Sequence, residues 1–182
     1  MPEASDKNRY NSVYKGTVAL NIDPMMQGRC YVLVPEISPT PLASPAEIFF
    51  PFGGMGAGMF SPAPIPGSCV WVQFRGGDLD YPLVVGARYE NPAEIPALAH
   101  ATPPGVDCKV MTTQLQNQFA MSDVPGPTGG FALLTPEGPG IIINSLGVFL
   151  FAGPDPLQGS ISITLAGVDI NGVGPTAGLS IK

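Results

Sequence analysis

Charged residues are scarce in this chain of 182 residues. Lys plus Arg number 8 and Asp plus Glu number 14, so that 12% of the sequence is charged and the formal net charge is −6. The basic residues are spread singly along the chain. A surface that follows a nucleic-acid backbone needs several adjacent cations, because its affinity comes from counterion release. The sequence therefore argues against a nucleic-acid partner.

Histidine and cysteine are rare as well. The only histidine, His100, stands in a proline-rich stretch with no nucleophile or metal ligand close to it in sequence, so we expect a surface position. The three cysteines, Cys30, Cys69 and Cys108, have no C-x-x-C spacing. We predict buried free thiols, with a disulfide as the alternative. We predict no catalytic group, no metal and no cofactor, and hence no enzyme.

Long apolar runs and helical periodicity are missing too. No stretch of about 18 apolar residues occurs, and no charged segment followed by an apolar core opens the chain. We therefore expect neither a transmembrane helix nor a signal peptide, and production in the cytoplasm. The 45% of hydrophobic residues and the mean hydropathy of +0.23 indicate a folded chain. Because 23 glycines and 22 prolines interrupt the apolar runs, we predict an all-β fold.

The clearest strand pair lies at residues 68–87. Residues 68–74 and 81–87 alternate in hydrophobicity, and the glycines and aspartates between them are typical of a turn. For Asp78 and Asp80 we favour hydrogen bonds to their own backbone over a carboxylate pair or half of a metal site. Three further runs raise the count to the five strands of a small barrel: residues 14–20, 30–34 and 46–52.

The glycine cluster at residues 53–58 raises the question of nucleotide binding. It does not fit the G-x-G-x-x-G pattern, and no G-K-[ST] follows it, so neither a dinucleotide site nor a phosphate-binding loop is supported. We predict a flexible or close-packed loop instead.

A series of short motifs, in this order and spacing, resembles the oligonucleotide/oligosaccharide-binding-fold (OB-fold) domain of the central spike of contractile tails. That family includes phage baseplate spikes, type VI secretion spikes and the spikes of extracellular contractile injection systems. The resemblance covers residues 14–89. It rests on Asp23-Pro24 with Gly28-Arg29, Val34-Pro35, the glycine cluster, Pro64-Ile65-Pro66-Gly67, Gly76-Gly77-Asp78-Leu79-Asp80-Tyr81-Pro82 and Val84-Val85-Gly86.

The remainder of the chain suggests a division into four parts. We predict an N-terminal arm at residues 1–12, the OB-fold barrel at 13–90, a proline-rich linker at 91–109 and a shaft at 110–182. Some members of the family carry a lysozyme domain at the linker. About twenty residues are too few for an independent fold, which needs roughly 40, so an inserted hydrolase is excluded.

The shaft region consists of short alternating runs separated by Gly, Pro or Asp. One chain offers a single row of narrow strands with no second layer to cover its apolar side, which is marginal in water. We therefore predict a triple-stranded β-helix, a prism formed by an intertwined homotrimer, with short outward residues such as Ser160, Ser162, Thr164 and Asn171. The predicted core of the shaft comprises Ile141, Ile143, Leu150, Ile161, Ile163, Leu165, Val168 and Ile170.

The resemblance implies a membrane-puncturing spike in a virion tail baseplate or injection particle, seated on a trimeric hub protein. The glycine cluster is expected to contact neighbouring subunits through Gly53, Gly54, Met55 and Gly56. Some relatives end in His-x-His repeats that bind metal, but no histidine follows His100. A separate tip protein of the Pro-Ala-Ala-Arg repeat type is then expected to cap Leu179, Ile181 and Lys182. The alternatives are a barrel that binds nucleic acid or saccharide, and a peptidoglycan hydrolase.

Overall fold

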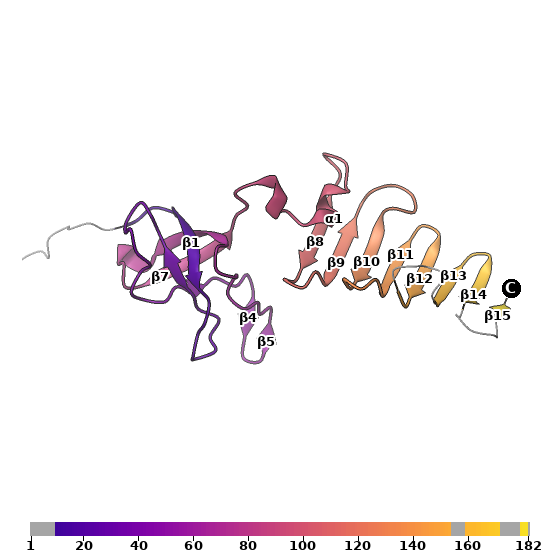
Figure 1. Cartoon of the computed structure of the whole chain (residues 1–182), viewed down its shortest axis with the longest axis horizontal. Helices are drawn as coiled ribbons and strands as arrows, with labels where there is room; N and C mark the ends of the chain where they lie inside the picture. Colours follow the sequence, from indigo (N-terminus) through magenta and orange to yellow (C-terminus); the bar gives the residue numbers. More distant parts are fainter. Residues whose placement is uncertain (1–9, 154–158, 172–178, 182) are drawn as a thin grey trace, which may run out of the picture. The chain divides into compact units, whose positions relative to one another are not determined.

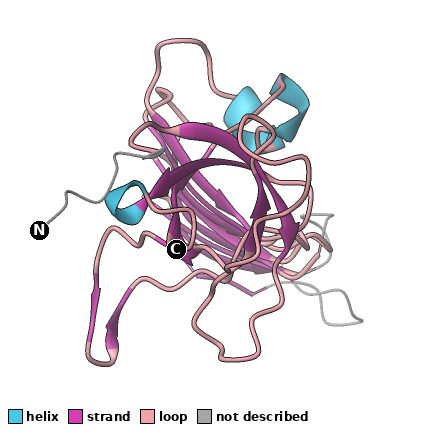
Figure 2. Cartoon of the chain, turned by 90° about the vertical axis from the view of Figure 1, so that its left-hand side faces the viewer, coloured by secondary structure: helices cyan, strands magenta, loops and turns pink. Residues whose placement is uncertain are grey.

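The structure is a computed structural model that describes residues 10–153, 159–171 and 179–181. Strands and loops account for nearly all of it, and the helices are short (Figure 2). The chain divides into two compact units, Met1–Pro92 and Ala93–Lys182. Each unit is described by itself.

The N-terminal unit is a five-stranded sheet in the order β2-β1-β6-β7-β3 (Figure 1). All neighbours are antiparallel except β3 and β7, which are parallel. Cys30 and Ala46, just before the two edge strands, form a bridge that joins the edges and closes the sheet into a barrel. The strands are β1 (Tyr14–Leu20), β2 (Tyr31–Leu33), β3 (Glu47–Ile48), β6 (Cys69–Phe74) and β7 (Pro82–Ala87).

The barrel encloses a small aliphatic core. Because side chains alternate along a strand, β6 turns Val70, Val72 and Phe74 inward. Burial of each such side chain contributes on the order of 1.5–3 kcal/mol, an upper estimate because unfolded chains are partly compact. The remaining buried members are Val18, Cys30, Val32, Val34, Leu42, Ala46, Ala63 and Val84.

The connection from β6 to β7 is the predicted tight turn. It contains the 3-10 turn η1 (Arg75–Gly77), in which Gly76 and Gly77 have φ of 65° and 74°, a region that favours glycine. The Asp78 carboxylate accepts a hydrogen bond from the backbone N–H of Asp80 at 3.0 Å. The predicted backbone role of Asp78 is thereby confirmed.

The glycine cluster differs from the predicted loop. It forms a separate hairpin, β4 (Gly53–Gly54) paired with β5 (Ala57–Gly58), that projects from the barrel (Figure 1). Gly58 has φ of 132°, and a Cβ atom there would lie 2.5 Å from the Cα of Gly53. Only glycine therefore allows the two strands to approach this closely, and Met55 stands at the tip.

The segment that joins the barrel to the next sheet contains little regular structure. It holds the 3-10 turn η2 (Pro92–Glu94) and the four-residue helix α1 (Ala97–His100). The prolines keep the helix short, as predicted. His100 is exposed, which agrees with its predicted surface position.

The C-terminal unit is an eight-stranded sheet in sequence order, from β8 to β15 (Figure 1). Every strand is antiparallel to the next, and the ladders lie within one chain. The predicted prism of an intertwined homotrimer stays a prediction. The strands are β8 (Cys108–Thr112), β9 (Gln118–Ser122), β10 (Gly130–Leu134), β11 (Gly140–Asn144), β12 (Gly147–Phe151), β13 (Ser160–Thr164), β14 (Gly167–Asn171) and β15 (Leu179–Ile181).

Two successive hairpins of this sheet repeat one pattern. The hairpin β11–β12 begins at Gly140 and the hairpin β13–β14 at Ser160, and each turns through two residues into a glycine. In both, the last residue of the first strand caps the turn. Asn144 Oδ1 accepts a bond from the Leu146 N–H, and Thr164 Oγ1 accepts one from the Ala166 N–H.

Candidate functional site

The strand register places the apolar residues of the C-terminal sheet in two columns on one face. Ile141 pairs with Leu150, which pairs with Ile161, and the same column continues to Ile170. The second column runs beside it through Ile143, Val148, Ile163 and Val168. Towards β9 the columns continue through Leu133 with Phe119 and through Phe131 with Met121. We call these two rows the apolar columns.

The apolar columns are not covered within one chain. Phe131, Leu133, Ile141, Ile143, Ile161, Ile163 and Ile170 are between 37% and 51% exposed. A soluble monomer rarely exposes so long a contiguous apolar strip, and a sheet with one apolar face is stable only when a second layer covers it. The geometry thus calls for a further apolar surface against these columns.

Seven of the eight predicted shaft residues lie on the apolar columns. Leu165 departs from the prediction, because it occupies the two-residue turn between β13 and β14 and is fully exposed. The alternation that begins at Ile161 ends with the strand at Thr164. The sequence pattern alone, I-x-I-x-L, gave no sign that the strand stops there.

Short polar side chains make up only part of the opposite face of the sheet. Ser160, Ser162 and Thr164 of β13 lie on this face and are half-buried. In contrast, Ile142 of β11 pairs with Phe149 of β12 on this same face. Leu134 and Phe151 also lean over Gly140, since a Cβ atom there would lie 2.9 and 3.0 Å from them. The predicted smooth outer face is therefore wrong for β11 and β12.

Glycines mark where neighbouring strands approach most closely. Gly147 begins β12 with φ of 151°, and a Cβ atom there would lie 2.0 Å from the carbonyl oxygen of Ile163. Gly130 begins β10 with φ of 102°, and its Cβ atom would lie 2.1 Å from the carbonyl oxygen of Ile143. In the sequence these glycines stand out only as breaks between apolar runs.

Two family models match this combination of barrel and sheet. The type VI secretion system/phage-baseplate injector OB domain matches residues 14–89. The phage baseplate V C-terminal trimerisation domain matches residues 109–174. The chain belongs to the family of baseplate spike proteins. The match to a trimerisation domain supports the predicted homotrimer.

The family places the spike in a virion or an injection particle, with a structural role in the baseplate. No curated protein matches the chain at a significant level. In the described part of the spike, no helix combines the length and apolarity needed to span a bilayer.

Asp23 and Arg29 form an ion pair inside the loop between β1 and β2. We call this ion pair, with the backbone hydrogen bonds to Asp23, the Asp23 clamp. The Asp23 carboxylate accepts bonds from Arg29 Nη2 at 2.9 Å and Nε at 3.1 Å, and from the backbone N–H groups of Met25, Gln27 and Arg29. The Arg29 guanidinium and these N–H groups hold the pKa of Asp23 well below its ordinary value. The Asp23 side chain is only 7% exposed, so the loop is built around this carboxylate.

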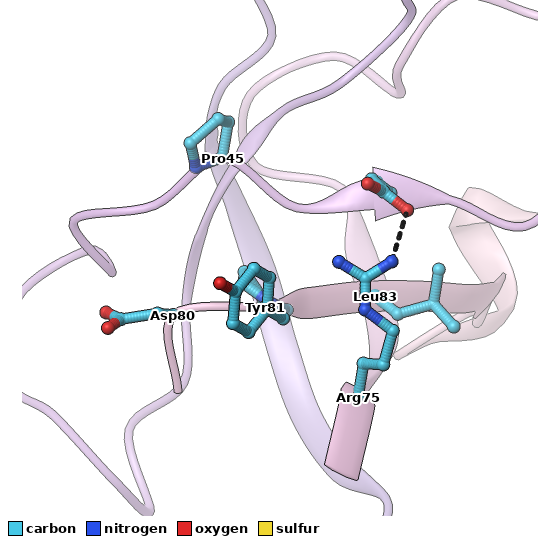
Figure 3. A pocket seen from close by; sticks show the side chains of 7 residues that line it. Pro45, Arg75, Asp80, Tyr81 and Leu83 are labelled. Carbon is cyan, nitrogen blue, oxygen red and sulfur yellow. Dashed lines mark ion pairs between the residues drawn. The ribbon is translucent and has the colours of Figure 1, made fainter. Parts of the chain in front are cut away.

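A small pocket lies on the barrel beside the β6–β7 turn (Figure 3). Arg75 reaches towards the Glu47 carboxylate at 3.8 Å, and its guanidinium lies 4.9 Å from the centre of the Tyr81 ring. The pocket volume is about 60 Å³. Sites for small molecules measure roughly 300–1,000 Å³, so this pocket is too small for a sugar or a nucleotide.

Neither metal-binding nor redox chemistry is indicated by the described residues. Among them, no group of three or more His, Cys, Asp and Glu side chains is placed to hold a metal ion. No disulfide joins the three cysteines, which all lie in the described residues, and burial raises the pKa of Cys30 to about 11. Cys30 and Cys69 are buried, as predicted, whereas Cys108 is half-buried.

The predicted contacts with other proteins fall at two places in the spike. Gly53, Gly54, Met55 and Gly56 form the projecting hairpin and are exposed. Leu179 and Ile181 belong to β15, which pairs with β14 at the end of the sheet. Lys182 lies outside the described residues.

Proposed function

We propose that this protein is the central spike that a contractile baseplate drives through the target envelope. The observation that carries the proposal is the pair of apolar columns left uncovered in a single chain. Three copies, each supplying one sheet as a wall, would turn these columns towards a common axis. The resulting prism would be stiff along its length, because each wall is a continuous hydrogen-bonded ladder.

The ends of such a spike would meet two partners. We expect the OB-fold barrel to sit on a trimeric hub protein, and the hairpin at Gly53, Gly54, Met55 and Gly56 to contact neighbouring subunits. At the other end, β15 is the edge strand of its sheet, and an open edge exposes unpaired backbone groups. A small tip protein of the Pro-Ala-Ala-Arg repeat type would cap this edge through Leu179, Ile181 and Lys182.

The work of such a spike is mechanical, and we propose no reaction for it. Contact with the target membrane would be transient, during contraction. The alternative function, a barrel that binds nucleic acid or saccharide, has less support. Cations that could line a binding groove are few, and Arg29, Arg75 and Arg88 are each engaged with a carboxylate in the described barrel.

The piercing role can be tested in assembled particles. We expect particles assembled by expressing this protein together with the genes that surround its own gene to permeabilise target cells. The measurement is the efflux of potassium from those cells. Particles that carry Ile163→Asp should fail to assemble a spike and should cause no efflux, whereas Ser162→Asp particles should retain it. Efflux from particles that lack this chain altogether would contradict the proposal.

A further inference from the structure

The apolar columns end in a charged side chain at β8, the first strand of the C-terminal sheet. Phe119 pairs with Met111 and Met121 pairs with Lys109, so that β8 continues both columns by one strand. Met111 is apolar and exposed, like the residues that follow it on its column, whereas Lys109 carries a charge. A lysine thus stands where the strands from β9 to β14 have methionine, phenylalanine, isoleucine or valine.

Two carboxylates lie beside Lys109 on the same face of the sheet. Asp107 comes two residues before Lys109, and Asp123 comes two residues after Met121. Because side chains alternate along a strand, each carboxylate shares a face with the column residue next to it. The Asp123 N–H donates to the Asp107 carbonyl oxygen at 3.0 Å, so the ladder continues to this pair. We call Asp107, Lys109 and Asp123 the charged end of the columns.

The charged end of the columns contains one more carboxylate than cations. The Lys109 ammonium donates to the Asp107 carboxylate within the chain. This hydrogen bond raises the pKa of Lys109, and the nearby Asp123 carboxylate adds to the shift. Asp123 itself forms no ion pair with any residue that the structure describes. Since the Lys109 side chain is also 61% exposed, it is accessible to a carboxylate of another chain.

The apolar columns alone do not fix how three copies are aligned along the shaft. The hairpins β11–β12 and β13–β14 carry the same residues at matching places, Ile143 with Ile163 and Val148 with Val168. A copy displaced by one hairpin, about 10 Å, would therefore meet almost the same apolar side chains. In coiled coils, a polar residue at a single level of an apolar seam removes such an ambiguity.

We propose that the charged end of the columns forms a ring of ion pairs between the three copies, in which Lys109 of each copy pairs with Asp123 of the next. The inference rests on the trimer of the proposed function and adds how its copies are aligned. The ring would continue the interface of the apolar columns, because it lies on the same face of the sheet. A copy displaced by one hairpin would set Lys109 against the apolar side chains of β10 in another copy. The ring therefore favours a single register, since an unpaired charge in an apolar interface is unfavourable.

Mixed assembly of charge-reversed copies tests the ring in the full-length protein. The variant that combines Lys109→Asp with Asp123→Lys has the same net charge as the original chain. We expect it to form trimers with itself, because the two charges of each pair are only exchanged. When it is coexpressed with the original chain, mixed trimers would bring like charges together at positions 109 and 123 of neighbouring copies.

Native mass spectrometry of copies with tags of different mass measures the mixing. Random assembly gives about three quarters mixed trimers, and we expect less than about one quarter. The matched control reverses an exposed ion pair within the barrel, by Arg75→Glu with Glu47→Arg. Copies that carry this control should mix at random with the original chain.

The outcomes separate the ring from the trimer itself. If the original protein sediments as a trimer and the copies reversed at positions 109 and 123 mix at random, the charges do not meet between copies. The ring is then wrong and the trimer stands. If the original protein sediments as a monomer, the trimer of the proposed function fails, and the ring fails with it.

A second pair of variants keeps the test decisive if the doubly changed chain does not assemble. Lys109→Asp copies coexpressed with Asp123→Lys copies should form mixed trimers in excess of about three quarters, because only mixed trimers bring opposite charges together at these positions. A random mixture, or no trimer in the coexpressed sample, would overturn the ring.

Discussion

Asp23 shows how one carboxylate organises a loop that has no regular structure. Five hydrogen bonds converge on it, from three backbone N–H groups and from two nitrogens of Arg29. The motif was visible in the sequence as D-P-x-x-x-G-R, but its role was not. A spacing of six residues does not reveal that the intervening N–H groups turn towards the carboxylate. That depends on the path of the loop, which the barrel determines.

Replacing this carboxylate should make barrel stability less dependent on pH. Because the pKa of Asp23 is lower in the folded state, its contribution is present above its unfolded value of about 3.9 and is lost as the pH falls below it. Asp23→Asn should therefore lower the urea midpoint at pH 7, and the difference from the original protein should shrink below about pH 4. Fluorescence of Trp71, the single tryptophan, reports on the barrel. A difference that is the same at pH 3 and pH 7 would contradict the clamp.

A single methyl group at Gly147 should disturb the C-terminal sheet. Its Cβ atom would meet a backbone oxygen that has no room to move, so Gly147→Ala should destabilise by roughly 1–3 kcal/mol. Gly86→Ala is the matched control, since Gly86 also lies in a strand and a Cβ atom there meets nothing within 4 Å. Size-exclusion chromatography in increasing urea compares the two. Equal effects would mean that the close approach of β12 to β13 is not as described.

At the scale of the strands and hairpins, much of the fold was open to prediction from sequence. Alternation with a period of two identified the five barrel strands and the apolar face of most shaft strands. It failed where side chains do not alternate, as in β4 and β5, which are mostly glycine. It also failed in β12, whose Val148, Phe149, Leu150 and Phe151 are apolar on both faces. An unbroken apolar run does not indicate which face of the strand another chain would cover.

A pair of adjacent substitutions in β13 tests which face is inward. Ile163→Asp would place three carboxylates against one another at the centre of the trimer and should abolish it, because a buried unpaired charge is strongly unfavourable. Ser162→Asp lies on the opposite face and should leave the trimer intact. Sedimentation velocity at micromolar concentration distinguishes trimer from monomer. Equal tolerance of both changes would mean that the apolar columns are not the interface.

At the scale of the whole molecule, the trimer accounts for what a single chain leaves unexplained. The chain has few charges to keep so much apolar surface soluble, and the apolar columns are partly exposed in a single chain. Sequence reasoning reached the trimer through the missing second layer. It did not show that Gly28 and Phe60 lie close together, because only the fold of the barrel brings these two residues together.

The purified protein should behave as one stable oligomer without nucleic-acid affinity. We expect a single trimeric species by sedimentation from about 1 to 50 μM, because an interface built from three apolar sheet faces holds at low concentration. Fluorescence anisotropy with single-stranded oligonucleotides at low salt should show no saturable binding. Micromolar binding would favour the alternative function of the barrel.

The hairpins β11–β12 and β13–β14 have the same pattern. They begin at Gly140 and at Ser160, and each has a two-residue turn that ends at a glycine. In the C-terminal sheet, each strand hydrogen-bonds only to the strands before and after it in the chain. Another hairpin of this pattern could therefore be inserted without rearranging the other strands. One inserted hairpin would lengthen each wall by two strand spacings, about 10 Å. The length of the C-terminal sheet can therefore change in steps of one hairpin.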